Sequence, residues 1–153
     1  MAAGLGEAAS ILGILGVAGQ AIESACTLYT SCKAYKEVNS ELERMIQDIE
    51  SLFNLLVEIK RVLPVLSATA SSPEIINSAQ RQIQICKVDL ASWVQKIDSL
   101  NLETAKGPRA MFKKVKIVAD KGYFAGIRTQ LSSHREEIAL LITVLVSYVS
   151  PYS

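Results

Sequence analysis

The sequence has few aromatic residues and few prolines, and it lacks the motifs of several large enzyme classes. Aromatic side chains make up 6% of the 153 residues, and there are four prolines, a mixture that favours helices packed through aliphatic side chains. No GxxxxGK sequence followed by Ser or Thr is present to hold phosphates, and no HExxH helix to hold zinc. His134 and Glu136 form an H-x-E match, but the P-C-x-x-C partner of the zinc deaminases is absent. We therefore expect neither an enzyme nor a cofactor or metal site.

Cysteine and N-terminal positive charge are also scarce. Cys26, Cys32 and Cys86 are odd in number and widely spaced, which fits neither a disulfide framework nor a metal site. Free thiols are typical of the reducing cytosol. Met1–Gly6 contains no Lys or Arg, and the first charged side chain is Glu7, whereas a secretory signal begins with a positive region. The sequence therefore predicts a non-secreted, cytoplasmic protein.

The overall charge balance gives little reason to expect a nucleic-acid partner. The formal net charge is +1, and no nucleic-acid reading motif is recognisable. Half of the residues are hydrophobic, and a chain of this length is long enough to bury a core of its own. We expect a single domain covering residues 1–153.

The most distinctive stretch is the uncharged run Ala8–Ile22, which lies between Glu7 and Glu23. As a helix it would measure roughly 22 Å, which is shorter than the ~30 Å hydrocarbon core of a bilayer. It is therefore expected not to span a membrane alone. Glycines recur at every third position within it, and each costs about 1 kcal/mol of helix stability relative to alanine. Small residues also allow helices to approach closely in lipid.

Two interpretations of this segment stay open. Residues 1–22 either form a helix that inserts into a membrane, or they pack permanently in a helical bundle, as apolar runs of this length often do. The residues assigned to insertion are Leu5, Ile11, Leu12, Gly13, Ile14, Leu15, Gly16, Val17, Gly19 and Ile22.

Hydrophobic periodicity predicts the helices. The first should run from Leu5 to about Lys36 with a bend after Gly19, and the second should follow an N-cap at Asn39 or Ser40. Apolar residues spaced three and four apart line one face of a helix, which we call a seam. Such seams later in the chain indicate two further long helices, the last of which should be buried in the bundle. The seams are Leu42, Met45, Ile49, Leu52, Leu56, Ile59, Leu63 and Leu66; Ile76, Ala79, Ile83, Cys86, Leu90, Trp93, Ile97 and Leu100; and Ile127, Leu131, His134, Ile138, Leu141, Leu145 and Tyr148.

Turn and cap residues define the expected helix ends. Ser40 and Glu43 have the spacing of a capping box, Pro64 should kink or end the second helix near Leu63, and Ser72 should cap a third helix that starts at Pro73. Because the link between the second and third helices is short, we expect these two to pack as antiparallel neighbours. An extended coiled-coil dimer is the alternative. The fold class is all-α, an antiparallel bundle of four to five helices with an apolar N-terminal helix.

A basic segment, residues 106–128, carries nearly half of the Lys and Arg residues and a single acid, Asp120. Pro108 and Gly122 bracket a short helix, in which ~100° per residue places Arg109, Lys113 and Lys116 on one strip. The residues expected on the opposite, apolar side are Met111, Phe112, Val115, Val118 and Ala119. Such a helix suits an anionic membrane surface, but a merely solvated face has the same pattern.

His134 on the last seam is expected to be a hydrogen-bonded core or boundary histidine rather than a ligand or pH sensor.

Several stretches resemble a known family. They are Met1-Ala2, Leu5-Gly6, Ala8-Ala9-Ser10-Ile11 and Gly13–Gly19, followed by Leu42, Ile49, Leu52, Leu55 and Leu56, and by Leu131, His134, Ile138 and Leu145. They look like the HeLo-like domains that open many fungal NOD-like receptor (STAND) proteins. The tryptophan often found near that family's basic stretch is absent here, and Phe112, Tyr123 and Phe124 are the nearest aromatic residues.

The resemblance implies a helical bundle related to the HET-S HeLo domain and to the mixed-lineage-kinase-like four-helix bundle that executes necroptosis. It also implies a cell-death function in fungal innate immunity or heterokaryon incompatibility. In that function the domain oligomerises, moves from the cytoplasm to the plasma membrane and permeabilises it. The implied partners are anionic lipids, further copies of the chain and an upstream NOD-like receptor or signalling region. The alternative is a cytosolic helical adaptor that signals through protein contacts without membrane insertion.

Overall fold

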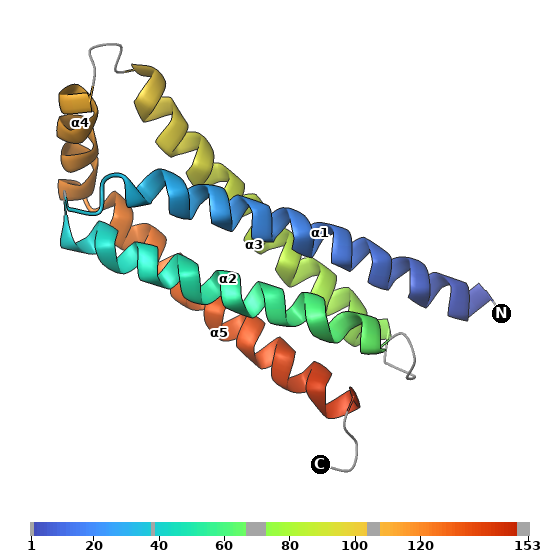
Figure 1. The fold of residues 1–153 in the computed structure, drawn as a ribbon. Coiled ribbons are helices and arrows are strands. Elements are labelled where there is room, and N and C mark those ends of the chain that lie inside the picture. The colour runs from blue at the N-terminus through green and yellow to red at the C-terminus, as the bar shows by residue number, and fades with distance from the viewer. Residues whose placement is uncertain (1, 38, 67–72, 104–107, 150–153) are drawn as a thin grey trace.

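The computed structural model describes the backbone of residues 2–37, 39–66, 73–103 and 108–149. Within these ranges the side chains of residues 2–10, 66, 73, 101–103, 108, 148 and 149 lie outside the description. The described backbone forms five helices and no strand: α1 Ala2–Lys33, α2 Ser40–Leu66, α3 Pro73–Glu103, α4 Pro108–Asp120 and α5 Tyr123–Val149 (Figure 1). The all-α prediction, with an apolar N-terminal helix, is confirmed.

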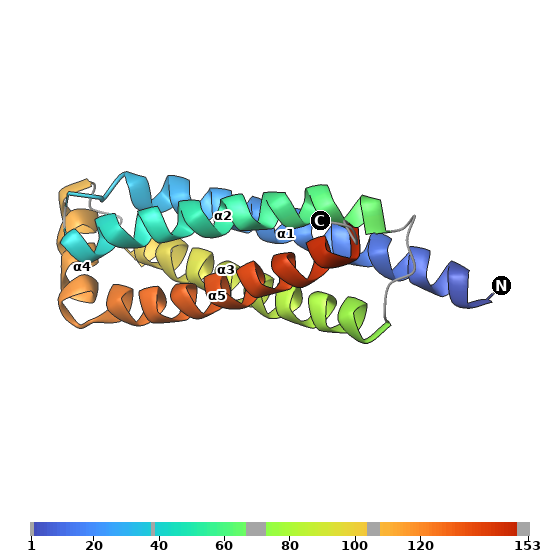
Figure 2. The same ribbon diagram turned by 90° about the horizontal axis from the view of Figure 1, so that it is seen from below.

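The four long helices form an elongated bundle, and the short α4 lies across one end of it (Figures 1 and 2). α1 packs against both α2 and α3, α2 packs against α5, and α3 and α5 make a looser contact. α1 and α2 run in opposite directions, whereas α1 and α3 run the same way, as do α2 and α5 (Figure 1). α4 contacts the adjoining parts of α3 and α5.

The expectation that α2 and α3 pack as neighbours is wrong, because their main partners are α5 and α1. Helices in contact lie ~8–10 Å apart, so opposite corners of a four-helix bundle lie only about 13 Å apart. The six residues from 67 to 72 can reach up to about 20 Å. A short link therefore permits a diagonal connection and does not impose adjacency.

The core follows the predicted seams. Within the described side chains, every seam residue of α2, α3 and α5 is buried, from Leu42 to Leu63, from Ile76 to Leu100 and from Ile127 to Leu145. Leu66 and Tyr148 have side chains outside the description. Phe124 at the start of α5 is also fully buried. The three-four spacing therefore identified the buried faces correctly.

The observed ends of α2 differ from the predicted ones. Asn39 rather than a Ser40–Glu43 box caps α2, because its side-chain oxygen accepts a hydrogen bond from the Glu41 backbone N–H at 2.7 Å. α2 continues past Pro64 to Leu66, since a proline in the last turn interrupts little helix beyond it. Residue 72, the expected cap of α3, lies outside the described residues.

Gly19 was predicted to bend the first helix, and Gly122 was predicted to cap the short one. α1 continues through Gly19 as one helix and ends at Lys33, slightly before the expected Lys36. Gly122 has a φ of 82°, and its backbone N–H donates to the Ala119 carbonyl at 3.0 Å. A glycine in this left-handed conformation is the usual end of a helix, so the prediction of a cap after α4 is confirmed.

Candidate functional site

The inner face of α1 is a narrow stripe dominated by small residues. Its buried residues repeat at three-four spacing: Ile11, Ile14, Ala18, Ala21, Ala25, Leu28 and Cys32. The three alanines are fully buried and let α1 lie close to α2 and α3. Each alanine removes less apolar area from water than a leucine or isoleucine would, and burial free energy scales with that area. The stripe therefore holds α1 against α2 and α3 through apolar contacts.

The outer face of α1 leaves most of the other predicted insertion residues at least partly exposed. Leu12 is 69% exposed, Gly13 and Gly16 are exposed, and Leu15, Val17, Gly19 and Ile22 are partly buried. The predicted set is thus divided, because Ile11 and Ile14 belong to the buried stripe. Leu5 lies on α1, but its side chain is outside the described residues. A helix that is apolar on nearly all sides is characteristic of a protein interior or a membrane.

The three glycines of α1 are not required by packing in the bundle. A Cβ atom added at Gly13, Gly16 or Gly19 would meet nothing within 4 Å. Alanine at each position would favour the helix by about 1 kcal/mol. The packing of the bundle therefore gives no structural reason for glycine at these three positions.

α1 is longer than the uncharged run that the sequence singled out. In the described part of the chain, Ile11–Lys33 forms one stretch of 23 residues that is long and apolar enough to cross a membrane, and 33% of its most apolar 18-residue window is buried in the bundle. At ~1.5 Å per residue it measures roughly 35 Å, compared with a hydrocarbon core of ~30 Å. The expectation that the segment is too short holds only for Ala8–Ile22. Core helices of soluble proteins share the same length and composition, so this property alone assigns no role.

Polar contacts distinguish α1 from α5. Among the described side chains, no hydrogen bond or ion pair joins α1 to another helix. α5, in contrast, is joined to α2 through Asp48, which accepts from Arg128 Nε at 2.9 Å and from Arg135 Nη1 at 3.1 Å. Arg128 also donates to Glu41 at 2.9 Å, and these hydrogen bonds, with Glu41 contributing most, raise the pKa of the Arg128 guanidinium above its usual value.

His134 joins α5 to α3 where these two helices are in looser contact. Its Nε2 lies 2.7 Å from Asp89 Oδ2, and its ring lies 6.3 Å from the Trp93 ring, centroid to centroid. His134 is 7% exposed. It is therefore a buried histidine with a polar partner, as the sequence predicted.

The predicted basic strip lies on the outer face of α4, where Arg109, Lys113 and Lys116 are all exposed. Met111, Val115 and Ala119 on the opposite side are buried, and Val118 is partly buried. Asp120 falls on the basic strip at ~100° per residue and reduces its positive charge.

The prediction that Phe112 lies on the apolar side of α4 is wrong, because its side chain is 42% exposed. It lies at the edge of the basic strip and makes an edge-on contact with Tyr35, 5.2 Å between ring centroids. Ile117, on the other edge of the strip, is 46% exposed. The outer face of α4 is thus a basic strip with an apolar residue on each side, a composition suited to an interface between water and lipid.

The two predicted contact sets lie far apart. The N-terminal half of α1 extends from one end of the bundle, and α4 lies at the other end (Figures 1 and 2). A membrane surface can meet both only if the long axis of the bundle lies along it or if α1 leaves its docked position.

The cysteines differ in accessibility. All three are free: Cys26 is exposed, whereas Cys32 and Cys86 are buried. Burial raises the thiol pKa of Cys32 and of Cys86 to about 12, so these two thiols stay protonated and unreactive at neutral pH. Within the described residues, no group of three or more His, Cys, Asp and Glu side chains is placed to hold a metal ion.

Comparisons with protein-family models, with curated proteins and with solved structures found no significant match for this chain. Function is therefore inferred from the chain's own residues and from their placement in the bundle.

Proposed function

We propose that this chain is a membrane-permeabilising cell-death execution domain in which α1 leaves the bundle, associates with other copies and inserts into the membrane. In this proposal the docked bundle is the cytoplasmic form, and activation moves it to the plasma membrane. Fungal immunity or heterokaryon incompatibility, with an upstream NOD-like receptor region, is the setting that the HeLo-like resemblance implies.

The observation that carries the proposal is the way in which α1 is held. Its described contacts with other helices are apolar and run along the whole buried stripe, which includes Ala18, Ala21 and Ala25. Hydrocarbon can replace apolar contacts, whereas it cannot replace ion pairs or hydrogen bonds to charged groups. Of the long helices, α1 thus has the contacts that a lipid environment replaces most easily, and its glycines would allow close helix–helix contact in lipid.

The basic strip of α4 supplies attraction to the membrane before insertion. Each Lys or Arg near an anionic leaflet contributes about 1 kcal/mol, so Arg109, Lys113 and Lys116 together contribute up to ~3 kcal/mol, weakened by salt. Phe112 and Ile117 at the edges of the strip add apolar contact with the interface.

The test compares two glycines in equivalent settings. Gly16 on α1 and Gly126 on α5 are both exposed helical glycines where an added Cβ meets nothing within 4 Å. Glutamate is therefore expected to be accommodated at either position in the soluble fold. In the hydrocarbon core, however, an ionised carboxylate costs ~2.5–3.5 kcal/mol or more.

We expect Gly16→Glu to abolish dye leakage from phosphatidylserine-containing vesicles and Gly126→Glu to leave it unchanged, with wild-type helical content in both variants. Equal leakage from the two variants would contradict insertion of α1. Deletion of Met1–Ile22 should also abolish leakage, provided that circular dichroism shows a folded remainder.

The alternative, a helical adaptor without membrane activity, is favoured by exposed apolar residues on two other helices. Ile85 and Val88 on α3 are 49% and 54% exposed, and Leu140 on α5 is 66% exposed. Such residues suit a partner helix. An adaptor would show neither vesicle binding nor leakage, and its partner binding would be lost on Ile85→Ser or Val88→Ser.

A further inference from the structure

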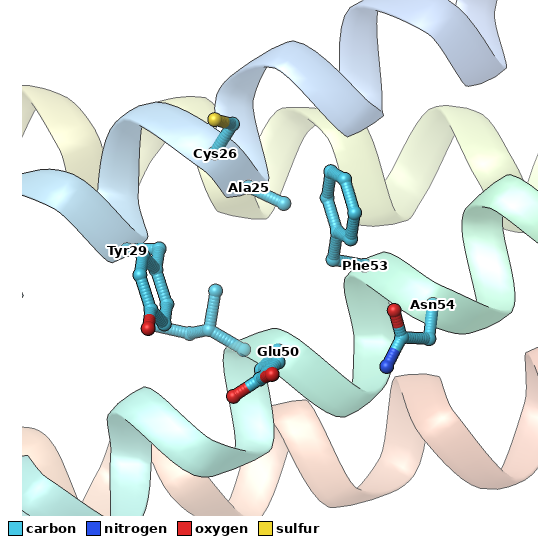
Figure 3. A pocket seen from close by; sticks show the side chains of 7 residues that line it. Ala25, Cys26, Tyr29, Glu50, Phe53 and Asn54 are labelled. Atoms are coloured by element: carbon cyan, nitrogen blue, oxygen red, sulfur yellow. The ribbon is translucent and has the colours of Figure 1, made fainter.

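A pocket between α1 and α2 is not used by the residues assigned to membrane contact. It has a volume of about 300 Å³ and is lined by Ala25, Cys26 and Tyr29 of α1 and by Ile49, Glu50, Phe53 and Asn54 of α2 (Figure 3). This volume is at the lower end of the range of small-molecule sites. Any occupant would contact both helices at once.

The interior of this pocket is apolar and aromatic. Ala25 and Ile49 are fully buried, and Tyr29 and Phe53 are partly buried. Figure 3 shows the Tyr29 and Phe53 rings on different sides of the space, with Glu50 and Asn54 at its edge on α2. An apolar group can therefore fit between two rings while a polar end remains near α2.

The charge of the pocket lining indicates which polar group an occupant should carry. Glu50 is the single charged residue of the lining, and among the described residues its carboxylate has no hydrogen bond or ion pair. The Tyr29 ring already attracts a cation, since Lys33 Nζ lies 5.5 Å from its centroid. Both an unpaired carboxylate and an aromatic ring favour a positive group.

We propose that this pocket binds a small organic cation with a compact apolar body, of the arylalkylammonium class. The apolar body lies between Tyr29 and Phe53, the ammonium group pairs with Glu50, and the side-chain carbonyl of Asn54 accepts one of its N–H groups. Because the occupant contacts α1 and α2 together, it stabilises the docked position of α1. This regulatory consequence rests on the proposed function, whereas binding itself does not.

Cys26 provides a reporter for the site in the unmodified chain. It lines the pocket and is exposed, whereas Cys32 and Cys86 are buried with a thiol pKa of about 12. Neutral iodoacetamide should therefore alkylate Cys26 first. A ligand in the pocket should slow that reaction.

The experiment measures the rate of Cys26 alkylation, by mass spectrometry, against rising concentrations of 2-phenylethylammonium or of the neutral analogue 2-phenylethanol. The ammonium should protect Cys26 at about fivefold lower concentration than the alcohol, as expected for one exposed ion pair and a cation–π contact. Glu50→Gln should remove this advantage. Glu43→Gln, an exposed acid on α2 outside the pocket lining, should keep it.

Equal protection by the two compounds, no protection by either, or an advantage that survives Glu50→Gln would overturn the proposed site.

Vesicle leakage tests the regulatory consequence separately. The ammonium should slow leakage by the wild type and not by Glu50→Gln. Protection of Cys26 with unchanged leakage would overturn the regulatory consequence. Protection with no leakage by any protein would instead overturn the proposed membrane function and leave the site standing.

Discussion

α1 and α5 are both long, largely apolar helices, but the bundle holds them by different chemistry. α5 is joined to α2 through Asp48 and to α3 through the contact between His134 and Asp89. The described contacts of α1 with other helices are apolar. Moving α5 into lipid would separate charged partners, which is costly in a medium of low polarity. Moving α1 would exchange one apolar environment for another. In the proposed mechanism, this difference is the reason why α1, and not α5, leaves the bundle.

The largest expected difference is in the free energy of unfolding, after truncation of one buried isoleucine on α1 or of one on α5. Ile14 on α1 and Ile138 on α5 are 0% and 1% exposed. Ile138→Ala should lower the free energy of global unfolding by ~2–4 kcal/mol, the usual result of truncating a buried isoleucine. In the proposed mechanism α1 detaches before global unfolding, although α3 then loses its main packing partner, so Ile14→Ala should lower this free energy by less than Ile138→Ala does.

Urea denaturation measures the global loss, and native-state hydrogen exchange shows where it acts. Exchange in Ile14→Ala should increase in α1 alone, and vesicle leakage should become faster. Equal losses of global stability, with exchange rising together in α1 and α5, would show that α1 is an integral part of the core.

The next largest effect concerns attraction to the membrane. Replacing Arg109, Lys113 and Lys116 with Glu should weaken binding to phosphatidylserine vesicles by at least ~3 kcal/mol at low salt, or roughly a hundredfold. The fold should be retained, because all three side chains are exposed. Co-sedimentation at two salt concentrations provides the measurement. Equal binding of the wild type to neutral and anionic vesicles would identify the strip as only a solvated surface.

The smallest expected effect separates helix stability from membrane activity. Gly126→Ala should raise the free energy of global unfolding by up to about 1 kcal/mol, since alanine favours a helix and the added Cβ meets nothing. Gly16→Ala should raise it by less, because α1 detaches before global unfolding in the proposed mechanism. Only Gly16→Ala should reduce leakage, because the added methyl group keeps α1 helices further apart in lipid than glycine does. Thermal melts and dye release measured on the same samples check both statements. Reduced leakage in both variants would remove the special role of Gly16.

The periodic seams of the sequence predicted the helices and their buried faces because both depend on spacing of three and four residues along one helix. The pairing of helices was not predicted, since the length of a link does not distinguish a neighbour from a diagonal partner. Contacts such as that between Asp89 and His134 join residues 45 positions apart, and the pocket combines residues of two helices. Phe112 was predicted to be buried, but it lies at the edge of the apolar face, where it stays partly exposed and contacts the Tyr35 ring. Those features follow from tertiary placement, which local periodicity does not contain.

The most direct test of release of α1 uses two leucines with matched exposure. Leu12 on α1 is 69% exposed and Leu140 on α5 is 66% exposed, so either can be changed to Cys and labelled without opening the core. In a Cys26→Ser background, where the remaining native thiols are buried, each variant carries one environment-sensitive NBD fluorophore. On phosphatidylserine vesicles the label at position 12 should brighten, shift to the blue and be quenched by nitroxide-labelled lipid tails. The label at position 140 should remain accessible to aqueous iodide. If both labels respond alike, or if the label at position 12 stays in water while the vesicles leak, then α1 is not the inserting helix.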